Sequence, residues 1–232
     1  MKIDKDLIDK IICTDCIKGL KKIPDNSIDV IITSPPYNLG NNHHTGSKKH
    51  KPYEDNMPEL EYQKWQINVL KECYRVLKDG GSMFYNHKNR IKNGIQISPY
   101  EWIFKTPFII KQELVWINRS QNFDKIRFYP FTERIYWLTK NNKTKLENVI
   151  KHSDVFHWTE WRPVGTKGNH TRAFPEKMVE DILSCFPSSK VILDPFAGSG
   201  TTLLVAKNKN KHFIGFDNNK KYCEIISKKI YE

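Results

Sequence analysis

Short apolar runs alternate with amphipathic segments along most of the 232-residue chain. The β-branched run 30–32 has no helical period, which suits a strand buried on both faces of a parallel sheet, and residues 190–193 have the same character. Between these runs, residues 59–77 carry apolar side chains at helical spacing and are followed by Gly80 and Gly81, which predicts an amphipathic helix. Strands and helices that alternate in this way predict an α/β fold.

The same pattern predicts the remaining elements. The predicted strands are 10–15, 28–33, 82–86, 109–117, 133–139, 190–193 and 212–216, and the predicted helices are 17–20, 59–77, 99–105, 174–186, 201–208 and a terminal helix from Lys220. No internal repeat is found, and the chain length suits one large α/β domain, so residues 1–232 are expected to form a single domain. Residues 141–169 are polar and irregular, which is typical of an insertion.

The chain is basic and rich in aromatic rings, with a formal net charge of +12 and 12% aromatic residues. Such a charge favours a polyanionic partner, and rings provide surfaces on which bases stack, so nucleic acid is the favoured partner; a basic cytosolic protein without one is the alternative. No apolar run reaches the length of a membrane span, and five scattered cysteines indicate a reducing, cytoplasmic compartment. Cys13 and Cys16 form a lone C-x-x-C pair without a second pair at zinc spacing, and in an extended segment their side chains would leave opposite faces, so no metal is expected.

The predicted strand 28–33 is followed by Ser34, Pro35, Pro36 and Tyr37. Two successive prolines lack amide hydrogens and fix their φ angles, so the strand ends in a stiff loop, and ligands of open α/β sheets bind beyond such strand ends. Ser34 Oγ and the Pro35 carbonyl are suited to accept the two N–H bonds of an exocyclic amino group, and Tyr37 offers a ring for an extruded base. These four residues are candidate catalytic residues for methyl transfer to a base; a structural Pro-rich turn is the alternative.

Two polar regions carry candidate nucleic-acid contacts. Residues 38–57 contain a basic run, and residues 118–132 interleave basic residues with Phe123, Phe128 and Tyr129. Basic residues contact phosphates and rings stack on bases, although a structural hairpin tip has a similar composition. The candidate DNA-binding residues are Lys48, Lys49, Lys51, Arg119, Lys125 and Arg127.

A glycine-rich loop follows the predicted strand 190–193. Gly198 and Gly200 allow the backbone to approach a ligand at a helix N-terminus, but neither a Walker A lysine nor the third glycine of a dinucleotide fold is present. Asp194 at the strand tip repels phosphate and attracts an ammonium group, and Asp217, at the next strand tip, has the spacing of a carboxylate that binds ribose hydroxyls. S-adenosylmethionine has both groups and fits this pattern, whereas a tight structural turn is the alternative.

At this point the chain resembles the amino-group DNA methyltransferases. Residues 194–202 resemble their cofactor loop, and residues 33–38 resemble their catalytic motif in the variant that begins with Ser. The segment through Asp15 resembles the stretch that meets the cofactor's adenine, and residues 170–175 resemble the segment that closes over the cofactor. The catalytic motif precedes the cofactor loop, as in the beta group. The resemblance implies that S-adenosylmethionine is bound by Asp15, Phe174, Asp194, Phe196, Gly198, Gly200, Thr201 and Asp217.

The resemblance also implies a fold and partners. The expected fold is a seven-stranded, mostly parallel, Rossmann-like methyltransferase sheet with one antiparallel strand, flanked by helices, with a small target-recognition insertion at about 118–169. That region is short for the group, so either a few base pairs of double-stranded DNA are recognised or a second protomer helps. A homodimer and a cognate restriction endonuclease of a restriction-modification system are the protein partners that the resemblance brings into consideration.

Several functions compete at this stage. Ser in the motif favours N4 of cytosine, with N6 of adenine as the alternative. Cytosine C5 chemistry needs a nucleophilic Cys, and the chain has no Pro-Cys dipeptide. Protein and ribosomal-RNA methyltransferases usually have the reverse motif order, which disfavours them without removing them. A basic nucleic-acid-binding module without catalysis is the non-enzyme alternative, and the intact motifs speak against it.

Overall fold

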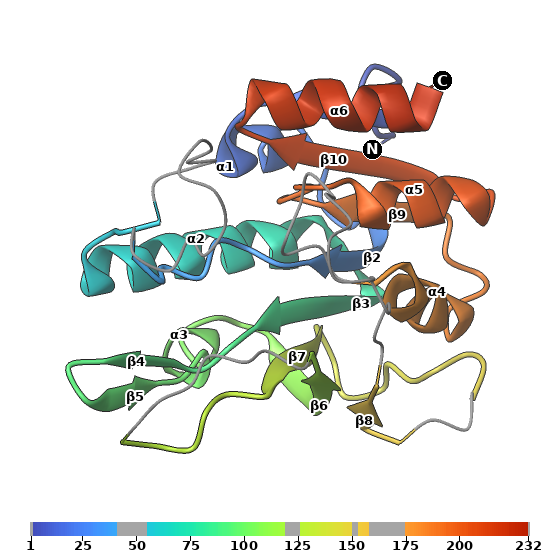
Figure 1. Ribbon diagram of the computed structural model, residues 1–232. Coiled ribbons are helices and arrows are strands. Elements are labelled where there is room, and N and C mark those ends of the chain that lie inside the picture. Colours follow the sequence, from blue (N-terminus) through green and yellow to red (C-terminus); the bar gives the residue numbers. More distant parts are fainter. Residues whose placement is uncertain (1, 41–54, 119–125, 150–152, 158–174, 232) are drawn as a thin grey trace.

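The computed structural model of the chain describes residues 2–40, 55–118, 126–149, 153–157 and 175–231 (Figure 1). Its strands are β1 (Lys10–Cys13), β2 (Ile28–Thr33), β3 (Leu77–His87), β4 (Arg90–Lys92), β5 (Ile95–Ile97), β6 (Ile109–Ile117), β7 (Thr132–Thr139), β8 (Val155–Phe156), β9 (Val191–Asp194) and β10 (His212–Asp217). Its helices are α1 (Cys16–Leu20), α2 (Glu59–Val76), α3 (Tyr100–Ile103), α4 (Glu176–Ser184), α5 (Thr201–Asn208) and α6 (Lys220–Tyr231).

One large sheet organises the described part of the chain. Its eight strands lie in the order β1-β10-β9-β2-β3-β7-β6-β8. Neighbouring strands are parallel except at β7, which runs antiparallel to both β3 and β6. The expected mostly parallel sheet with one antiparallel strand is confirmed, and the two-residue strand β8 adds an eighth strand to the seven expected.

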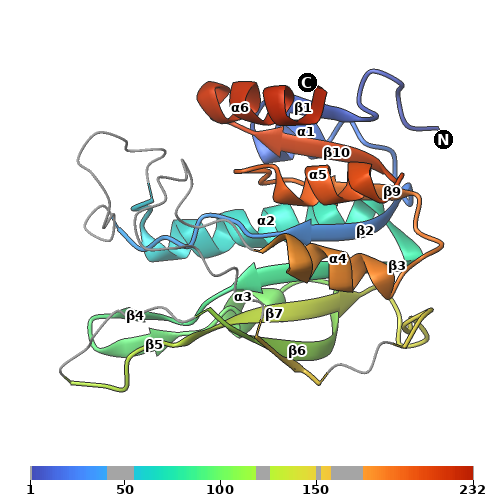
Figure 2. The same cartoon turned by 45° about the vertical axis from the view of Figure 1, so that its right-hand side comes forward.

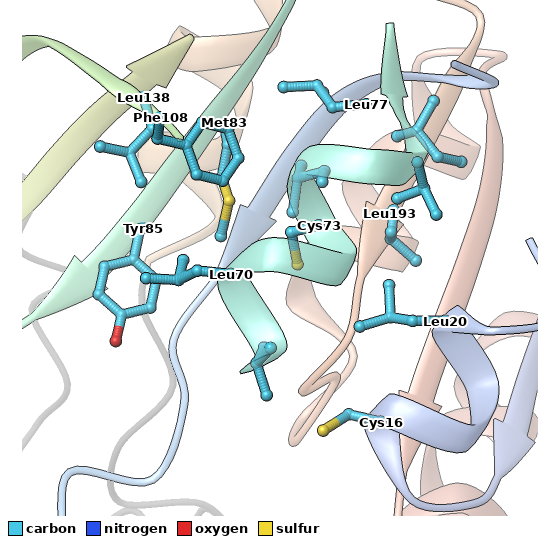
Figure 3. Close-up of a cluster of buried hydrophobic side chains, with 14 of the residues drawn as sticks. Cys16, Leu20, Leu70, Cys73, Leu77, Met83, Tyr85, Phe108, Leu138 and Leu193 are labelled. Atoms are coloured by element: carbon cyan, nitrogen blue, oxygen red, sulfur yellow. The ribbon is translucent and has the colours of Figure 1, made fainter. Parts of the chain in front are cut away.

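Helices cover both faces of this sheet. On one face α1, α2 and α3 share a buried hydrophobic cluster with Ile31 of β2, and on the other α4, α5 and α6 share a second cluster with Val30 and Ile32. Figure 3 shows part of the first cluster, in which Leu20 of α1 and Leu70 of α2 are fully buried. Strand β2 is therefore buried on both sides, as its apolar run predicts. None of the described helices is long and apolar enough to cross a membrane.

The boundary between α2 and β3 differs from the prediction. Helix α2 ends at Val76, and β3 begins at the next residue and runs through the two glycines that were expected to close the helix. A Cβ on Gly81 would lie 2.8 Å from the carbonyl oxygen of Asp29, so this glycine permits a close approach of β2 and β3. The predicted strand 82–86 is thus only the second half of an eleven-residue strand.

A small hairpin made by β4 and β5 was not predicted. Its two strands pair antiparallel around Asn93 and Gly94, whose φ angles are +51° and +77°. Positive φ at both central residues is the mark of the two-residue turn that Asn-Gly favours. The signal was therefore present in the sequence.

Part of the region assigned to target recognition belongs to the main sheet. Strand β7 lies within residues 118–169, yet it pairs with β3 on one side and with β6 on the other. The candidate recognition region is therefore divided into two stretches, 118–131 and 140–169, that flank an internal strand. Of these stretches, residues 118, 126–131, 140–149 and 153–157 belong to the described part of the chain.

Candidate active site

The predicted catalytic and cofactor loops meet at one edge of the sheet. Strands β2, β9 and β10 are parallel, so their carboxyl ends lie together, and Figure 2 shows β2 and β10 pointing the same way. Thr33 at the end of β2 donates from Oγ1 to Oδ1 of Asp194 at the end of β9, over 2.7 Å. Both residues are buried. The loop that follows Thr33 is thus fixed directly to the strand that leads into the glycine-rich loop.

A hydrogen-bond network surrounds the candidate catalytic loop, residues 34–37, called the catalytic loop below. The hydroxyls of Ser34 and Tyr37 lie 2.7 Å apart, and the Tyr37 hydroxyl donates to Glu133 Oε2 over 3.0 Å. Asn86 at the end of β3 donates from Nδ2 to the Tyr37 oxygen over 2.6 Å and to Glu133 over 3.0 Å. Burial, reinforced by the Glu133 carboxylate, raises the pKa of Tyr37 well above its usual value. The phenol therefore stays protonated and acts as a hydrogen-bonding group.

The two glycines of the glycine-rich loop have a left-handed backbone conformation. Gly198 and Gly200 have φ angles of +51° and +80°, and a Cβ on Gly200 would lie 2.8 Å from Ile226 Cγ2. The amide of Gly198 donates to Asp217 Oδ2 over 2.9 Å. The backbone of the loop between β9 and α5 can therefore be approached closely by a ligand, because its glycines have no side chains. The hydrogen bond from Gly198 fixes this loop to the tip of β10.

Asp194 lies beneath the glycine-rich loop. Its side chain is 1% exposed, and its Oδ1 accepts from Thr33 and from the Phe196 amide, over 2.7 and 3.0 Å. Burial raises the pKa of Asp194 to about 6, although these hydrogen bonds lower it. Burial also raises the pKa of Asp217. Two carboxyl groups with raised pKa values under one loop favour a ligand that brings positive charge.

Comparison with known proteins agrees with this geometry. A family model of N6/N4 methyltransferases, described as DNA methylase, matches residues 28–228. The chain belongs to this family. The methylase is 29% identical over 256 residues to the type II methyltransferase M.BglII of Bacillus subtilis, covering 95% of this chain and 68% of that protein. It is 32% identical over 254 residues to M.HpaI of Haemophilus parainfluenzae, covering 95% and 74%.

Solved structures share the fold of the methylase. The PvuII DNA methyltransferase, which is cytosine-N4-specific, superimposes with a TM-score of 0.73 at 22% identity, covering 94% of this chain and 85% of that one. A protein of Thermus thermophilus described as a putative DNA modification methylase, complexed with S-adenosyl-L-methionine, superimposes with a TM-score of 0.68 at 19% identity, covering 95% of this chain and 92% of that one. The sheet described above is thus the sheet of known DNA methylases.

Three further predicted cofactor residues of the methylase, Asp15, Phe196 and Thr201, differ in exposure and in their contacts. Asp15 is exposed and accepts from the Lys18 amide as the N-cap of α1, next to the tip of β10. Phe196 is half-buried, with its ring edge-on to Trp65 at 5.6 Å, and Thr201 opens helix α5. Asp15, Phe196 and Thr201 thus lie at the same edge of the sheet as Asp194 and Asp217.

Several predicted residues of the methylase fall outside the described part of the chain. These residues are Lys48, Lys49, Lys51, Arg119, Lys125 and Phe174. Arg127 is described and is exposed in the connection between β6 and β7. Phe128, the next residue, is fully exposed as well. This connection therefore presents a cation and a ring to solvent.

Helix α2 holds the back of the catalytic loop. The Tyr62 hydroxyl donates to the Pro36 carbonyl over 2.7 Å and lies 2.7 Å from His87 Nε2. Burial lowers the pKa of His87 to about 3, so its imidazole is neutral, and its ring lies 4.6 Å from the Tyr37 ring. Burial also raises the pKa of Tyr62. These neutral rings support the loop without adding charge.

Asp55 closes the loop on its other side. Its carboxylate accepts from the amides of Asn38 and Leu39, over 2.6 and 3.1 Å, and the Gly40 amide donates to its backbone carbonyl over 2.7 Å. Asn38 has a φ angle of +57°, which Asn tolerates better than most residues. The turn that ends the catalytic motif is therefore stabilised by a carboxylate that sequence reasoning did not identify.

The sequence reasoning missed four supporting residues in addition. Asn86, Glu133, Tyr62 and His87 all reach the catalytic loop from other elements. A polar Asn86-His87 pair at the carboxyl end of a strand was a signal that the sequence offered. Glu133 and Tyr62 gave no such signal, because their contacts depend on strand register and on the position of α2.

Proposed function

We propose that this DNA methylase transfers a methyl group to the exocyclic amino group of an extruded base, with N4 of cytosine as the favoured acceptor and N6 of adenine as the alternative. The observation that carries the proposal is the 2.7 Å hydrogen bond between Thr33 and Asp194, which joins the candidate catalytic loop to the candidate cofactor loop. A transfer reaction requires donor and acceptor to be held close together. This contact keeps the two loops adjacent.

The cofactor is S-adenosylmethionine, whose sulfonium supplies an activated methyl group. Gly198 and Gly200 form the backbone cradle, and their positive φ angles disfavour any other residue there. Asp217 ties the cradle to β10 and is the candidate partner of the ribose hydroxyls. Asp194 supports the cofactor's ammonium group through its charge beneath the loop, and the remaining candidates are Asp15, Phe174, Phe196 and Thr201.

The acceptor site is the loop Ser34 to Tyr37. Ser34 Oγ and the Pro35 carbonyl accept the amino hydrogens of the base and stabilise the positive charge that develops on its nitrogen. Pro36 keeps the loop stiff, and its carbonyl is held by Tyr62. The ring of Tyr37 provides a stacking face for the base.

Ser34 supports cytosine N4 over adenine N6, because the resembled family uses Ser at this position mostly for cytosine. A hydroxyl cannot act as a strong base, but neither acceptor requires one, since the amino proton becomes acidic only after the methyl group has arrived. Adenine N6 stays the second candidate, since the family has exceptions.

Double-stranded DNA is the proposed substrate, and its phosphates are contacted by the basic residues Lys48, Lys49, Lys51, Arg119, Lys125 and Arg127. The net charge of +12 and the exposed Arg127 and Phe128 support this assignment. The two stretches that flank β7 are proposed to read the target sequence. A homodimer would supply a second recognition surface, and a cognate restriction endonuclease would complete a restriction-modification system.

Nucleoside mass spectrometry of DNA from cells that express the methylase tests this function. We expect N4-methylcytosine with the native chain and much less of it with Tyr37→Ala. Detection of N6-methyladenine alone would overturn the cytosine assignment but keep the acceptor chemistry. Equal modification by the native chain and by Tyr37→Ala would contradict the acceptor site.

A further inference from the structure

Glu133 collects hydrogen bonds from three elements at the candidate active site. It is the second residue of β7, and its carboxylate accepts from the Tyr37 hydroxyl over 3.0 Å and from Asn86 Nδ2 over 3.0 Å. Asn118, just beyond β6, donates from Nδ2 to the other carboxylate oxygen over 2.8 Å. An ionised carboxylate only accepts hydrogen bonds. Glu133 therefore accepts all three of these hydrogen bonds and donates none.

The acceptor role of Glu133 determines which hydroxyl donates in the hydrogen bond between Tyr37 and Ser34. The single proton of the Tyr37 hydroxyl is donated to Glu133, so Tyr37 can only accept from Ser34 across their 2.7 Å contact. The Ser34 hydroxyl therefore donates its proton to the Tyr37 oxygen. The lone pairs of Ser34 Oγ then face away from that bond, and the only donor to them among the described residues is Asn86 Nδ2, at 3.4 Å.

Asn86 reinforces this direction. Its Nδ2 lies 2.6 Å from the Tyr37 oxygen, 3.0 Å from Glu133 and 3.4 Å from Ser34 Oγ, so its two hydrogens serve the two nearer acceptors. Among the described residues, its buried Oδ1 has no hydrogen-bond partner. A buried oxygen without a partner is costly, which indicates that the amide is held in this orientation by Tyr37 and Glu133.

We propose that Glu133 is a positioning residue that orients the Ser34 hydroxyl through Tyr37, so that Ser34 Oγ presents lone pairs to the amino group of the base. This inference rests on the proposed function, in which Ser34 accepts an amino hydrogen. Without Glu133, the Tyr37 proton is free to turn toward Ser34, and the Ser34 proton then points at the base. A proton directed at an amino group that is gaining positive charge opposes the reaction.

A double-mutant cycle on turnover tests this proposal. In Glu133→Ala we expect kcat to fall about 10-fold or more, which is less than the roughly 10²- to 10³-fold loss on removal of a group that contacts the reacting atoms, because Glu133 acts through Tyr37. Cofactor affinity and the KM for DNA should change by less than about threefold, because in this proposal Glu133 acts through Tyr37 and binds neither ligand itself. In a Ser34→Ala or Tyr37→Phe background, the same change should cost less than about twofold, since no hydroxyl chain is left to orient.

Glu113→Ala is the matched control. Glu113 on β6 also accepts from a tyrosine hydroxyl, that of Tyr100, over 2.6 Å, and it pairs with Arg134 outside the catalytic loop. Its removal should leave kcat unchanged. Should Glu133→Ala fail to bind S-adenosylmethionine, Glu133→Gln, which preserves the side-chain size, replaces it in the cycle.

The outcomes separate this inference from the proposed function. An equal loss from Glu133→Ala in the native and Ser34→Ala backgrounds would show that Glu133 acts independently of Ser34 and would overturn the positioning role. Full turnover in Glu133→Ala would overturn it as well. Full turnover in Ser34→Ala would instead overturn the proposed acceptor role of Ser34, and the inference with it.

Discussion

Thr33 and Asp194, the last residues of β2 and β9, are joined by a buried 2.7 Å hydrogen bond from Oγ1 to Oδ1. The bond lies between residues that are 161 positions apart in the chain. It connects the start of the catalytic loop to the start of the glycine-rich loop. The bond therefore holds the two strand tips next to each other.

Thr33→Val removes the donor of this bond and keeps the shape of the side chain. We expect the free energy of unfolding in urea to fall by about 1 to 3 kcal/mol, because a buried carboxyl loses a partner. Affinity for S-adenosylmethionine should also fall. Thr139→Val is the control, since buried Thr139 donates to the Asn141 carbonyl far from the cofactor loop. Equal cofactor affinity in both variants would contradict the coupling of the two loops.

The stability of the cofactor-free protein should depend on the ionisation of Asp194. Its pKa is about 6 in the fold, above the value of about 3.9 for an unfolded chain, so between these values the folded state binds more protons. Its contribution to stability is therefore greatest below pH 4 and is lost as pH rises through 6, by up to about 3 kcal/mol. Urea unfolding of Asp194→Asn should lack this decline. If the free energies of unfolding of the native chain and of Asp194→Asn change in parallel from about pH 4 to 7, Asp194 is not the group responsible for the decline.

Cofactor binding should release protons near pH 6. The ammonium group of the cofactor favours the ionised form of Asp194, so binding lowers the pKa of that carboxyl. Calorimetry in buffers with different ionisation enthalpies measures the released fraction. Asp194→Asn should bind more weakly and release fewer protons, while equal release would assign the protons to another group such as Asp217, whose pKa is also raised.

Gly200→Ala should damage the cofactor loop. The backbone has a φ angle of +80°, which costs an alanine about 1 to 2 kcal/mol, and the new Cβ would meet Ile226 Cγ2 at 2.8 Å. Both thermal stability and cofactor affinity are expected to fall. Gly80→Ala has nothing within 4 Å of the added Cβ and should keep both. Unchanged cofactor affinity in Gly200→Ala would argue that the loop is only a structural turn.

Tyr37 variants separate stacking from hydrogen bonding. Tyr37→Ala should lose most turnover but keep cofactor affinity. From the sequence, Tyr37→Phe is expected to retain much activity, because the ring survives. The structure lowers that expectation, since the hydroxyl contacts Ser34, Asn86 and Glu133. Turnover of Tyr37→Phe should therefore lie between those of the native chain and Tyr37→Ala.

DNA affinity should fall steeply with salt, with a log-log slope of about −0.9 for each phosphate neutralised. Arg127→Ala should make this slope less steep by about one unit if Arg127 contacts a phosphate. Lys228→Ala is the control, because Lys228 is exposed on α6, away from the connection between β6 and β7 (Figure 1). An identical slope for the native chain and Arg127→Ala would exclude Arg127 from the interface.

The sequence predicted the elements whose pattern is local. The apolar run of β2 and the helical repeat of α2 were sufficient to place both elements. The glycines at 198 and 200 predicted a loop that a ligand can approach closely, and both have positive φ angles in the structure. Strand β8 could not be found in this way, since two residues carry no period. The start of β3 was missed because Gly80 and Gly81 favour a helix end, whereas Gly81 is needed for contact between strands.

The supporting residues of the site depend on contacts between distant segments. Asn86 meets Glu133 because β3 and β7 pair antiparallel in one register, with Asn86 opposite Ile135 and His87 opposite Arg134. No spacing within a single sequence encodes that register. The position of Asp194 shows a related limit: the sequence places it at a strand tip, but only the packing of Thr33 against it shows that its carboxyl lies beneath the loop.

The hydrogen bond from Asn118 to Glu133 joins the two ends of the connection between β6 and β7. Both ends of that connection are fixed in the sheet, whereas Arg127 and Phe128 between them face solvent. For protein engineering, this arrangement defines two splice points. A connection of different sequence, grafted between an intact Asn118 and an intact Glu133, would change the surface offered to DNA while leaving the hydrogen bonds around Ser34 and Tyr37 in place.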